Sequence, residues 1–178
     1  MILNCNNTNI SIIKEATNLD DFKCGDYDLE KYLKKDAFYD VKNKLSVTWL
    51  VHMDDVIIGF FTLANASINT SLINVGDGEC EYPYQSYPAL KIARMATHTD
   101  YKNRGVGRAM LIETVAKAEI ISHYSGCRFI VVDSKKKSVG FYQKYGFRIP
   151  RWMANKIEAR STIPLYIDLN KVSIGNIK

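Results

Sequence analysis

Residues 93–111 read A-R-M-A-T-H-T-D-Y-K-N-R-G-V-G-R-A-M-L, and this stretch constrains the fold more than any other. Its apolar beginning predicts the end of a β-strand, and the residues from about Arg104 to Tyr124 predict a long amphipathic helix. Gly105 and Gly107 lie between them, where they permit a tight turn and close approach of backbone N–H groups to a ligand. Because a helix N-terminus favours anions, the pattern predicts a cradle for a pyrophosphate group.

Cations surround this turn, since Lys102, Arg104 and Arg108 add formal positive charge. A glycine pair after a strand is weak evidence on its own, because an ordinary strand-to-helix turn also explains it. A dinucleotide-binding G-x-G-x-x-G pattern is absent, since Ala109-Met110 follow the second glycine. A P-loop is excluded because the sequence contains no G-K-[S/T].

Residues 132–147, V-D-S-K-K-K-S-V-G-F-Y-Q-K-Y-G-F, are the second informative stretch. They predict the end of a strand, a helix from about Lys136 to Tyr145, and a helix end at Gly146.

The remaining elements follow from hydrophobic patterning. Asp26 is a candidate N-cap for a helix through about Val41, and Asp54-Asp55 predicts a hairpin turn. Residues 67–88 predict a long connection of the kind that is often functional. Strands are predicted at 10–16, 46–53, 56–66, 89–97, 128–132, 147–150 and 162–169. The order predicts an α/β fold with a mixed sheet and helices on its faces.

Length and composition indicate one globular domain, because 178 residues with 47% hydrophobic content suffice for one core. No apolar run approaches the roughly 20 residues that span a bilayer. Residues 1–13 lack the basic and apolar regions of a signal peptide. We therefore expect a cytoplasmic protein that makes no use of a membrane.

The four cysteines form no C-x-x-C pair, so the sequence predicts neither a metal site nor a dithiol redox centre. They are Cys5, Cys24, Cys80 and Cys127. We expect Cys127 to be a small apolar residue at a strand entrance, with a nucleophilic cysteine as the alternative.

Charge is distributed unevenly along the chain. Residues 1–90 carry 7 Lys/Arg against 13 Asp/Glu, and residues 91–178 carry 17 against 6. The excess cations indicate either a polyanionic ligand or a solvated lysine-rich face.

On the two quoted stretches together, the chain resembles the GNAT superfamily of N-acetyltransferases. That family carries [Q/R]-x-x-G-x-[G/A] before a helix and F-Y-x-x-x-G-F downstream, and this chain has K-N-R-G-V-G at 102–107 and F-Y-Q-K-Y-G-F at 141–147. Lys102 departs from the usual Gln or Arg, so we expect a weaker or altered phosphate contact there. The resemblance covers roughly residues 10–169 and implies one acetyltransferase domain over 1–178.

The resemblance implies a mixed, mostly antiparallel central sheet with helices on both faces and splayed fourth and fifth strands. It implies acetyl-CoA as co-substrate, without a metal, bound where those strands separate. The coenzyme contacts that it implies are Met95, Ala96, Thr97, Lys102, Asn103, Arg104, Gly105, Val106, Gly107, Arg108, Ser138 and Phe141. For Phe141, core packing is the favoured interpretation.

The resemblance also implies direct attack of the amine on the thioester. The backbone N–H of Ala96 or Met95 would stabilise the developing oxyanion, and Tyr142 would protonate the departing thiolate. A packed aromatic is the alternative interpretation of Tyr142.

The general base is less well defined. His98, Asp100 and Glu81 are candidates, although each also fits a solvated surface residue. An α-amine is about 30% neutral at pH 7.4 whereas a lysine amine is only about 0.1% neutral, so a missing base favours an α-amine acceptor.

A closer resemblance is to the toxin-type GNAT enzymes of bacterial toxin–antitoxin modules, which acetylate aminoacyl-tRNA. It is carried by Phe22-Lys23-Cys24-Gly25, by the stretch 59–64 (G-F-F-T-L-A) and by Ala93-Arg94-Met95-Ala96. It implies an aminoacyl-tRNA acceptor, an antitoxin partner and a homodimer.

A tRNA would be contacted by the positive second half of the chain. Candidate contacts are Lys135, Lys136, Lys137, Arg148, Arg151, Lys156 and Arg160. Trp152 or Tyr145 would stack on a base, although Trp152 is interpreted first as a core or dimer contact.

Two alternatives remain open. One is an acetyltransferase for a small-molecule amine or a protein N-terminus or lysine, with Asp77, Glu79 and Glu81 shaping a pocket for a cationic amine. The other is a module that holds coenzyme A without catalysis.

Overall fold

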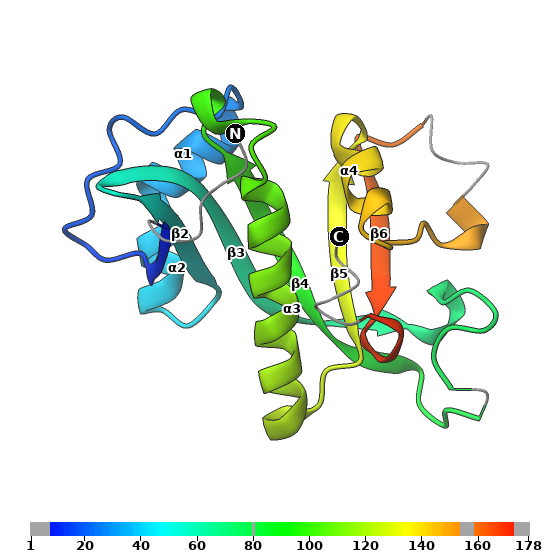
Figure 1. Cartoon of the computed structure of the whole chain (residues 1–178). Coiled ribbons are helices and arrows are strands. Elements are labelled where there is room, and N and C mark those ends of the chain that lie inside the picture. The colour runs from blue at the N-terminus through cyan, green and yellow to red at the C-terminus, as the bar shows by residue number, and fades with distance from the viewer. Residues whose placement is uncertain (1–7, 80, 154–158, 173–178) are drawn as a thin grey trace. The chain divides into compact units, whose positions relative to one another are not determined.

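The computed structural model describes residues 8–79, 81–153 and 159–172 (Figure 1). The elements are β1 (Thr8–Ile12), α1 (Tyr27–Lys35), α2 (Ala37–Lys42), β2 (Val47–Met53), β3 (Val56–Asn69), β4 (Ser86–Thr97), α3 (Val106–Ser125), β5 (Phe129–Lys135), α4 (Val139–Lys144) and β6 (Thr162–Asp168). Short 3₁₀ turns occupy 70–72, 99–101, 136–138, 151–153 and 169–171. Within these ranges, no helix combines the length and the apolar character that crossing a membrane requires.

The described strands form one sheet in the order β1-β2-β3-β4-β5-β6. The pairs β1/β2, β2/β3 and β5/β6 are antiparallel, whereas β4 and β5 are parallel from Ala89↔Phe129 to Ile92↔Val132. The predicted mixed and mostly antiparallel sheet is thereby confirmed. The hairpin turn at Asp54-Asp55 is also confirmed, and Asp54 has a left-handed φ of 54°.

The chain divides into two compact units. The first comprises Met1–Ala64 and Ala93–Glu113, and the second comprises Asn65–Ile92 and Thr114–Lys178.

In the first unit, alternate residues of β3 face opposite sides of the sheet. Phe60 lies in a buried cluster with Leu33 and Ala37, so this face is covered by α1 and α2. On the other face, an ideal Cβ at Gly59 would lie 2.9 Å from Val106 Cγ1, so the first residue of α3 packs directly against β3. Helices therefore cover both faces of the sheet here, as predicted.

The second unit has its own aromatic core. Ile68, Tyr87, Ala89, Phe129 and Tyr166 are all buried together. The ring of Phe129 makes edge contacts with Tyr87 at 5.1 Å and with Tyr166 at 5.7 Å between centroids. These contacts fix β4, β5 and β6 against each other.

Two helix and strand predictions near the N-terminus were wrong. The single helix from Asp26 to Val41 is two helices, because Asp36 has a φ of −109°, away from the helical value, and both ends α1 and precedes α2. The first strand ends at Ile12, since Thr17 N then donates to Lys14 O and turns the chain.

The predicted strand at 147–150 is only an isolated bridge between Arg148 and Tyr166. Pro150 has no N–H to extend the ladder, and a 3₁₀ turn begins at Arg151. The strand predicted at 162–169 is confirmed as β6.

Candidate functional site

The turn between β4 and α3 is exposed from Lys102 to Gly105. Asn103 and Gly105 have φ angles of 60° and 91°, and α3 begins directly after them at Val106. Ala109 N donates to Gly105 O at 3.0 Å and closes the first helical turn. Helix geometry gives the N–H groups before Ala109 no acceptor within the helix. The turn therefore has the form that an anion site requires.

The three cations of this turn have different surroundings in the structure. Lys102 Nζ donates to Cys24 O at 2.8 Å, so its ammonium is directed to the segment that precedes α1. The Arg104 guanidinium lies 5.3 Å from the centroid of the Tyr101 ring. Arg108 is exposed on the first turn of α3.

The end of β4 is anchored in the first unit. Ala96 is buried in the cluster that includes Phe60, while Met95 and Thr97 on either side are half-buried. His98 N donates to Ile58 O at 2.9 Å and holds the end of β4 to β3.

His98, a candidate general base, is engaged at both ring nitrogens. Asp100 N donates to Nδ1 at 3.2 Å, so Nε2 carries the hydrogen and donates to Asp21 O at 3.3 Å. The imidazole is buried and packs edge-on against Phe22 and Tyr101. This arrangement makes His98 part of the framework, and Asp100 and Glu81 are exposed surface residues.

The remaining site residues lie around α4 in the second unit. Tyr142 is 6% exposed, and its ring meets the edges of Phe141 at 5.1 Å and Phe147 at 5.3 Å. Burial raises the pKa of the Tyr142 phenol, which therefore stays protonated throughout the neutral range. Ser138 and Phe141 are half-buried. The coenzyme contacts named from β4 and α3 belong to the first unit and those from α4 to the second.

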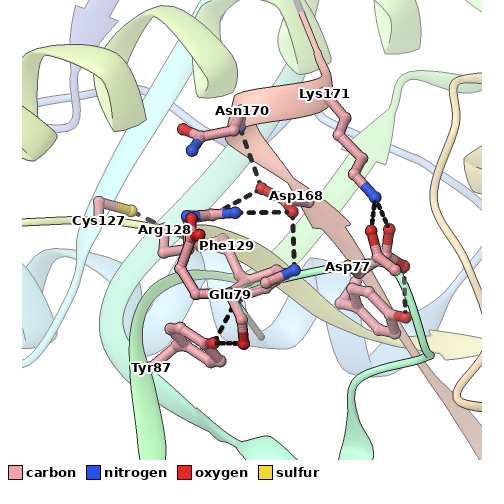
Figure 2. Close-up of polar contacts among 12 residues, drawn as sticks. Asp77, Glu79, Tyr87, Cys127, Arg128, Phe129, Asp168, Asn170 and Lys171 are labelled. Atoms are coloured by element: carbon pink, nitrogen blue, oxygen red, sulfur yellow. Dashed lines mark hydrogen bonds and ion pairs between the residues drawn. The ribbon is translucent and has the colours of Figure 1, made fainter. Parts of the chain in front are cut away.

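The long connection before β4 is held by ion pairs within the second unit (Figure 2). Asp77, whose side chain is 1% exposed, accepts from Arg148 at 3.1 Å, from Lys171 at 2.6 Å and from the Tyr166 hydroxyl at 2.8 Å. Lys171 also donates to Gly76 O.

A second group lies beside it. Arg128 Nη1 pairs with Glu79 at 2.5 Å, and Arg128 Nε and Nη2 bond to Asp168 at 2.8 and 3.2 Å. Gly78 N and Asn170 N donate to the same carboxylate at 3.0 Å each. Burial opposes ionisation of Asp168, but the bonds from Arg128, Gly78 and Asn170 hold its pKa below the ordinary value. The bonds to the Asp168 and Glu79 carboxylates raise the pKa of Arg128.

These pairs correct the expectation for Asp77 and Glu79, two of the three acids expected to shape a pocket for a cationic amine. Asp77 pairs with Arg148 and Lys171, and Glu79 pairs with Arg128. Arg148, a predicted nucleic-acid contact, is therefore used in an ion pair within the chain. The sequence did not predict that Arg128 pairs with Glu79 and Asp168, because no local pattern indicates an ion pair between residues so far apart in the chain.

A hollow of about 340 Å³ lies in the second unit, lined by Ser71, Leu72, Ile73, Asn74, Arg151 and Trp152. Trp152 is 39% exposed, so the interpretation of this ring as core is wrong. The Arg160 guanidinium lies 5.7 Å from the ring centroid. Of the other predicted nucleic-acid contacts, Lys156 lies outside the described residues, whereas Lys136 and Lys137 are exposed.

The thiols that the structure describes, Cys24 and Cys127, are buried and free. Burial raises the pKa of Cys24 and raises that of Cys127 to about 11. Neither therefore has the thiolate character of a nucleophile. Cys5 and Cys80 lie outside the described residues. Within those residues, no three His, Cys, Asp or Glu side chains form a group that could hold a metal ion.

The family model described as an acetyltransferase (GNAT) domain matches residues 44–149. The chain belongs to the GNAT acetyltransferase family. It is an acetyltransferase, and the match includes both the glycine turn and Tyr142. The comparison with curated proteins found no match.

Solved structures with the same fold include several toxin acetyltransferases. A mutant of KacT in which phenylalanine replaces a tyrosine has a TM-score of 0.83 at 18% identity, covering 97% of this GNAT chain and 99% of that one. AtaT complexed with acetyl-methionyl-tRNAfMet has a TM-score of 0.79 at 16% identity, covering 92% and 95%. A tyrosine-to-phenylalanine mutant of AtaT, bound to the C-terminus of the antitoxin AtaR and acetyl-CoA, has a TM-score of 0.72 at 16% identity, covering 92% and 94%.

Proposed function

We propose that this acetyltransferase uses acetyl-CoA to acetylate the α-amine of an aminoacyl-tRNA by direct attack. The observation that carries the coenzyme assignment is the exposed turn at Lys102–Gly105, which opens α3 with two left-handed residues and nearby arginines. Such a turn fits a diphosphate because helix N-terminal N–H groups and cations both attract anions. The AtaT complexes, whose descriptions name acetyl-CoA and an acetylated tRNA, support the same assignment.

Acetyl-CoA would supply an acyl thioester. The N–H groups of residues 104–108 would bind its pyrophosphate, with Asn103 shaping the turn. The backbone of Met95, Ala96 and Thr97 would pair with the amides of its pantetheine arm, since exposed strand edges need partners. Ser138 and Phe141 are proposed contacts from the second unit.

Two groups would handle charge and protons. The N–H of Ala96 would donate to the acyl oxygen as negative charge develops on it. Tyr142 Oη would give its proton to the sulfur as the C–S bond breaks and the C–N bond forms, while the amine loses its proton to water. With its raised pKa, Tyr142 is protonated before the step, and its phenolate would afterwards regain from water the proton that the amine has released.

Two features favour an aminoacyl-tRNA as the acceptor. His98 is occupied by framework hydrogen bonds, so an amine that is already partly neutral, such as an α-amine, would be the easier nucleophile. The exposed ring of Trp152, with Arg151 and Arg160 beside it, offers the aromatic and cationic groups that single-stranded nucleic acid favours. The likeness to AtaT bound to the antitoxin AtaR supports an antitoxin partner for this chain. We also propose a homodimer and a cytoplasmic location.

The test is incubation of the full chain with labelled acetyl-CoA and total charged tRNA, with Tyr142→Phe as the matched variant. We expect label on the aminoacyl group for the wild type and a loss of about 100-fold or more for the variant. Uncharged tRNA and free amino acids serve as controls. Release of free thiol with small amines but no label on tRNA would reject the acceptor, and no release with any amine would reject the coenzyme assignment.

A further inference from the structure

The connection between β4 and α3 is bonded to the segment Asp21–Gly25, which we call the brace. Lys102 Nζ donates to Cys24 O at 2.8 Å and Thr99 N donates to Lys23 O at 2.8 Å. His98 Nε2 bonds to Asp21 O at 3.3 Å. Three residues of the connection therefore meet three carbonyls of the brace, in the same order along the chain.

The brace is itself held firmly. Phe22 is buried and packs edge-on against Phe60 with ring centroids 5.5 Å apart. The N–H groups of Cys24 and Gly25 both donate to Glu30 Oε1, at 2.7 and 2.9 Å. These two donors lower the pKa of Glu30, which sits in the first turn of α1. The carbonyl that receives Lys102 is thus fixed to a helix.

The position of Lys102 in the turn is informative. It directly precedes Asn103, whose φ is left-handed, and two residues later Gly105 is left-handed as well. Left-handed conformations are unfavourable for a non-glycine residue unless neighbouring contacts hold them. A tether at the start of the turn supplies such a contact.

We propose that Lys102 is a positioning residue, whose ammonium ties the glycine turn to the brace and so orients the N–H groups at the start of α3. This inference rests on the proposed acetyl-CoA site, and it deepens that site by removing Lys102 from the set of phosphate ligands. The benefit to binding comes from preorganisation, because a turn that is already ordered loses less entropy when a ligand arrives.

The test compares the ligand-free full chain as wild type, Lys102→Met and Lys102→Arg, with Lys23→Met as a matched control. Lys23→Met removes the same charge from an exposed side chain of the brace but leaves its carbonyl bond to Thr99 intact. The readouts are thermal unfolding, amide hydrogen exchange at residues 103–108, and calorimetric binding of acetyl-CoA and of S-acetylpantetheine, which lacks the phosphates.

We expect Lys102→Met to lower the Tm of the ligand-free chain by about 2–4 °C and to speed exchange at residues 103–108 about fivefold. Acetyl-CoA binding should weaken about fivefold, while S-acetylpantetheine binding stays unchanged. Lys102→Arg should restore most of each property because arginine keeps a donor, and Lys23→Met should behave as wild type.

The proposal is overturned if Lys102→Met weakens acetyl-CoA binding while Tm and exchange match the wild type, since Lys102 would then bind phosphate directly. Equal weakening of S-acetylpantetheine would also overturn it, because the defect would not be confined to the phosphate turn. If the wild-type chain fails to bind acetyl-CoA, the proposed function fails, and the exchange data alone decide whether Lys102 holds the turn.

Discussion

Replacing Arg128 with methionine should destabilise the second unit strongly, because it leaves a buried carboxylate without its cation. The Asp168 side chain is 2% exposed and accepts two bonds from the guanidinium, at 2.8 and 3.2 Å. After the change, the N–H groups of Gly78 and Asn170 are the donors to this carboxylate that remain among the described residues. Breaking a buried ion pair costs about 3–5 kcal/mol of stability. Because two donors to the carboxylate remain, we expect the free energy of unfolding to fall by about 3 kcal/mol. For a chain of this size that corresponds to a Tm lower by about 6–12 °C.

The assay is denaturant and thermal unfolding at pH 7, with Lys91→Met as the control. Lys91 pairs with Asp133 at 2.6 Å, but the two side chains are 39% and 51% exposed, so its loss should cost below about 1 kcal/mol. The double variant Arg128→Met/Asp168→Asn should recover part of the stability because no buried charge remains. The reasoning is refuted if Arg128→Met costs no more than Lys91→Met.

The Arg128–Asp168 pair also makes the stability of the chain depend on pH. The pKa of Asp168 is lowered in the folded chain, so its contribution is fully present above the unfolded value near about 3.9 and is lost as pH falls through the folded value. Without Arg128, burial instead favours the protonated acid. As pH falls, the stability difference between wild type and Arg128→Met should therefore begin to narrow above about pH 4, where Asp168 of the folded variant takes up a proton. It should narrow further as pH falls through the folded pKa of Asp168 in the wild type.

Three further outcomes are expected. Gly59→Ala would place Cβ 2.9 Å from Val106 Cγ1, so unfolding measurements should show a loss of about 1–3 kcal/mol and calorimetry should show weaker acetyl-CoA binding. Gly140→Ala should show neither effect, because a Cβ there meets no atom within 4 Å beyond its chain neighbours and the backbone of its own helix. Tyr142→Phe should keep the Tm within a few degrees while thiol release slows about 100-fold or more, and an unchanged rate would remove Tyr142 from the acid role. Cys127, with its pKa near 11, should resist iodoacetamide at pH 7 until the chain unfolds, and rapid labelling of the folded chain would contradict its burial.

The sequence predicted the strand, turn and helix around Gly105 well because each signal there is local. Apolar periodicity marks β4 and α3, and a glycine with positive φ marks the turn between them. The sequence stretch 59–64 also marks Gly59, but it does not explain why glycine is needed there. The reason is a tertiary contact, since only the structure shows that α3 begins against Gly59.

The polar contacts of the second unit could not be predicted in the same way. Asp77 and Lys171 belong to segments joined only by the fold, and neither residue type nor spacing indicates that they pair. The sequence supplied a true excess of positive charge, but it could not show which cations, such as Arg148, are paired with acids of the same chain. A charge total therefore overstates the surface available to a nucleic acid.

The segments Phe22–Gly25 and Lys102–Gly107 resemble two separate motifs of the family. In this chain they are bonded to each other. Gly25 has a φ of 75°, a left-handed conformation that glycine adopts readily, and its Cα lies close enough to Lys102 that a Cβ there would be in van der Waals contact with Nζ at 3.6 Å. A lysine suits this place because its flexible stem and charged head can reach a single backbone carbonyl. The departure at Lys102 is then explained by the carbonyl that it meets: the side chain has exchanged a role at the ligand for a role in the framework.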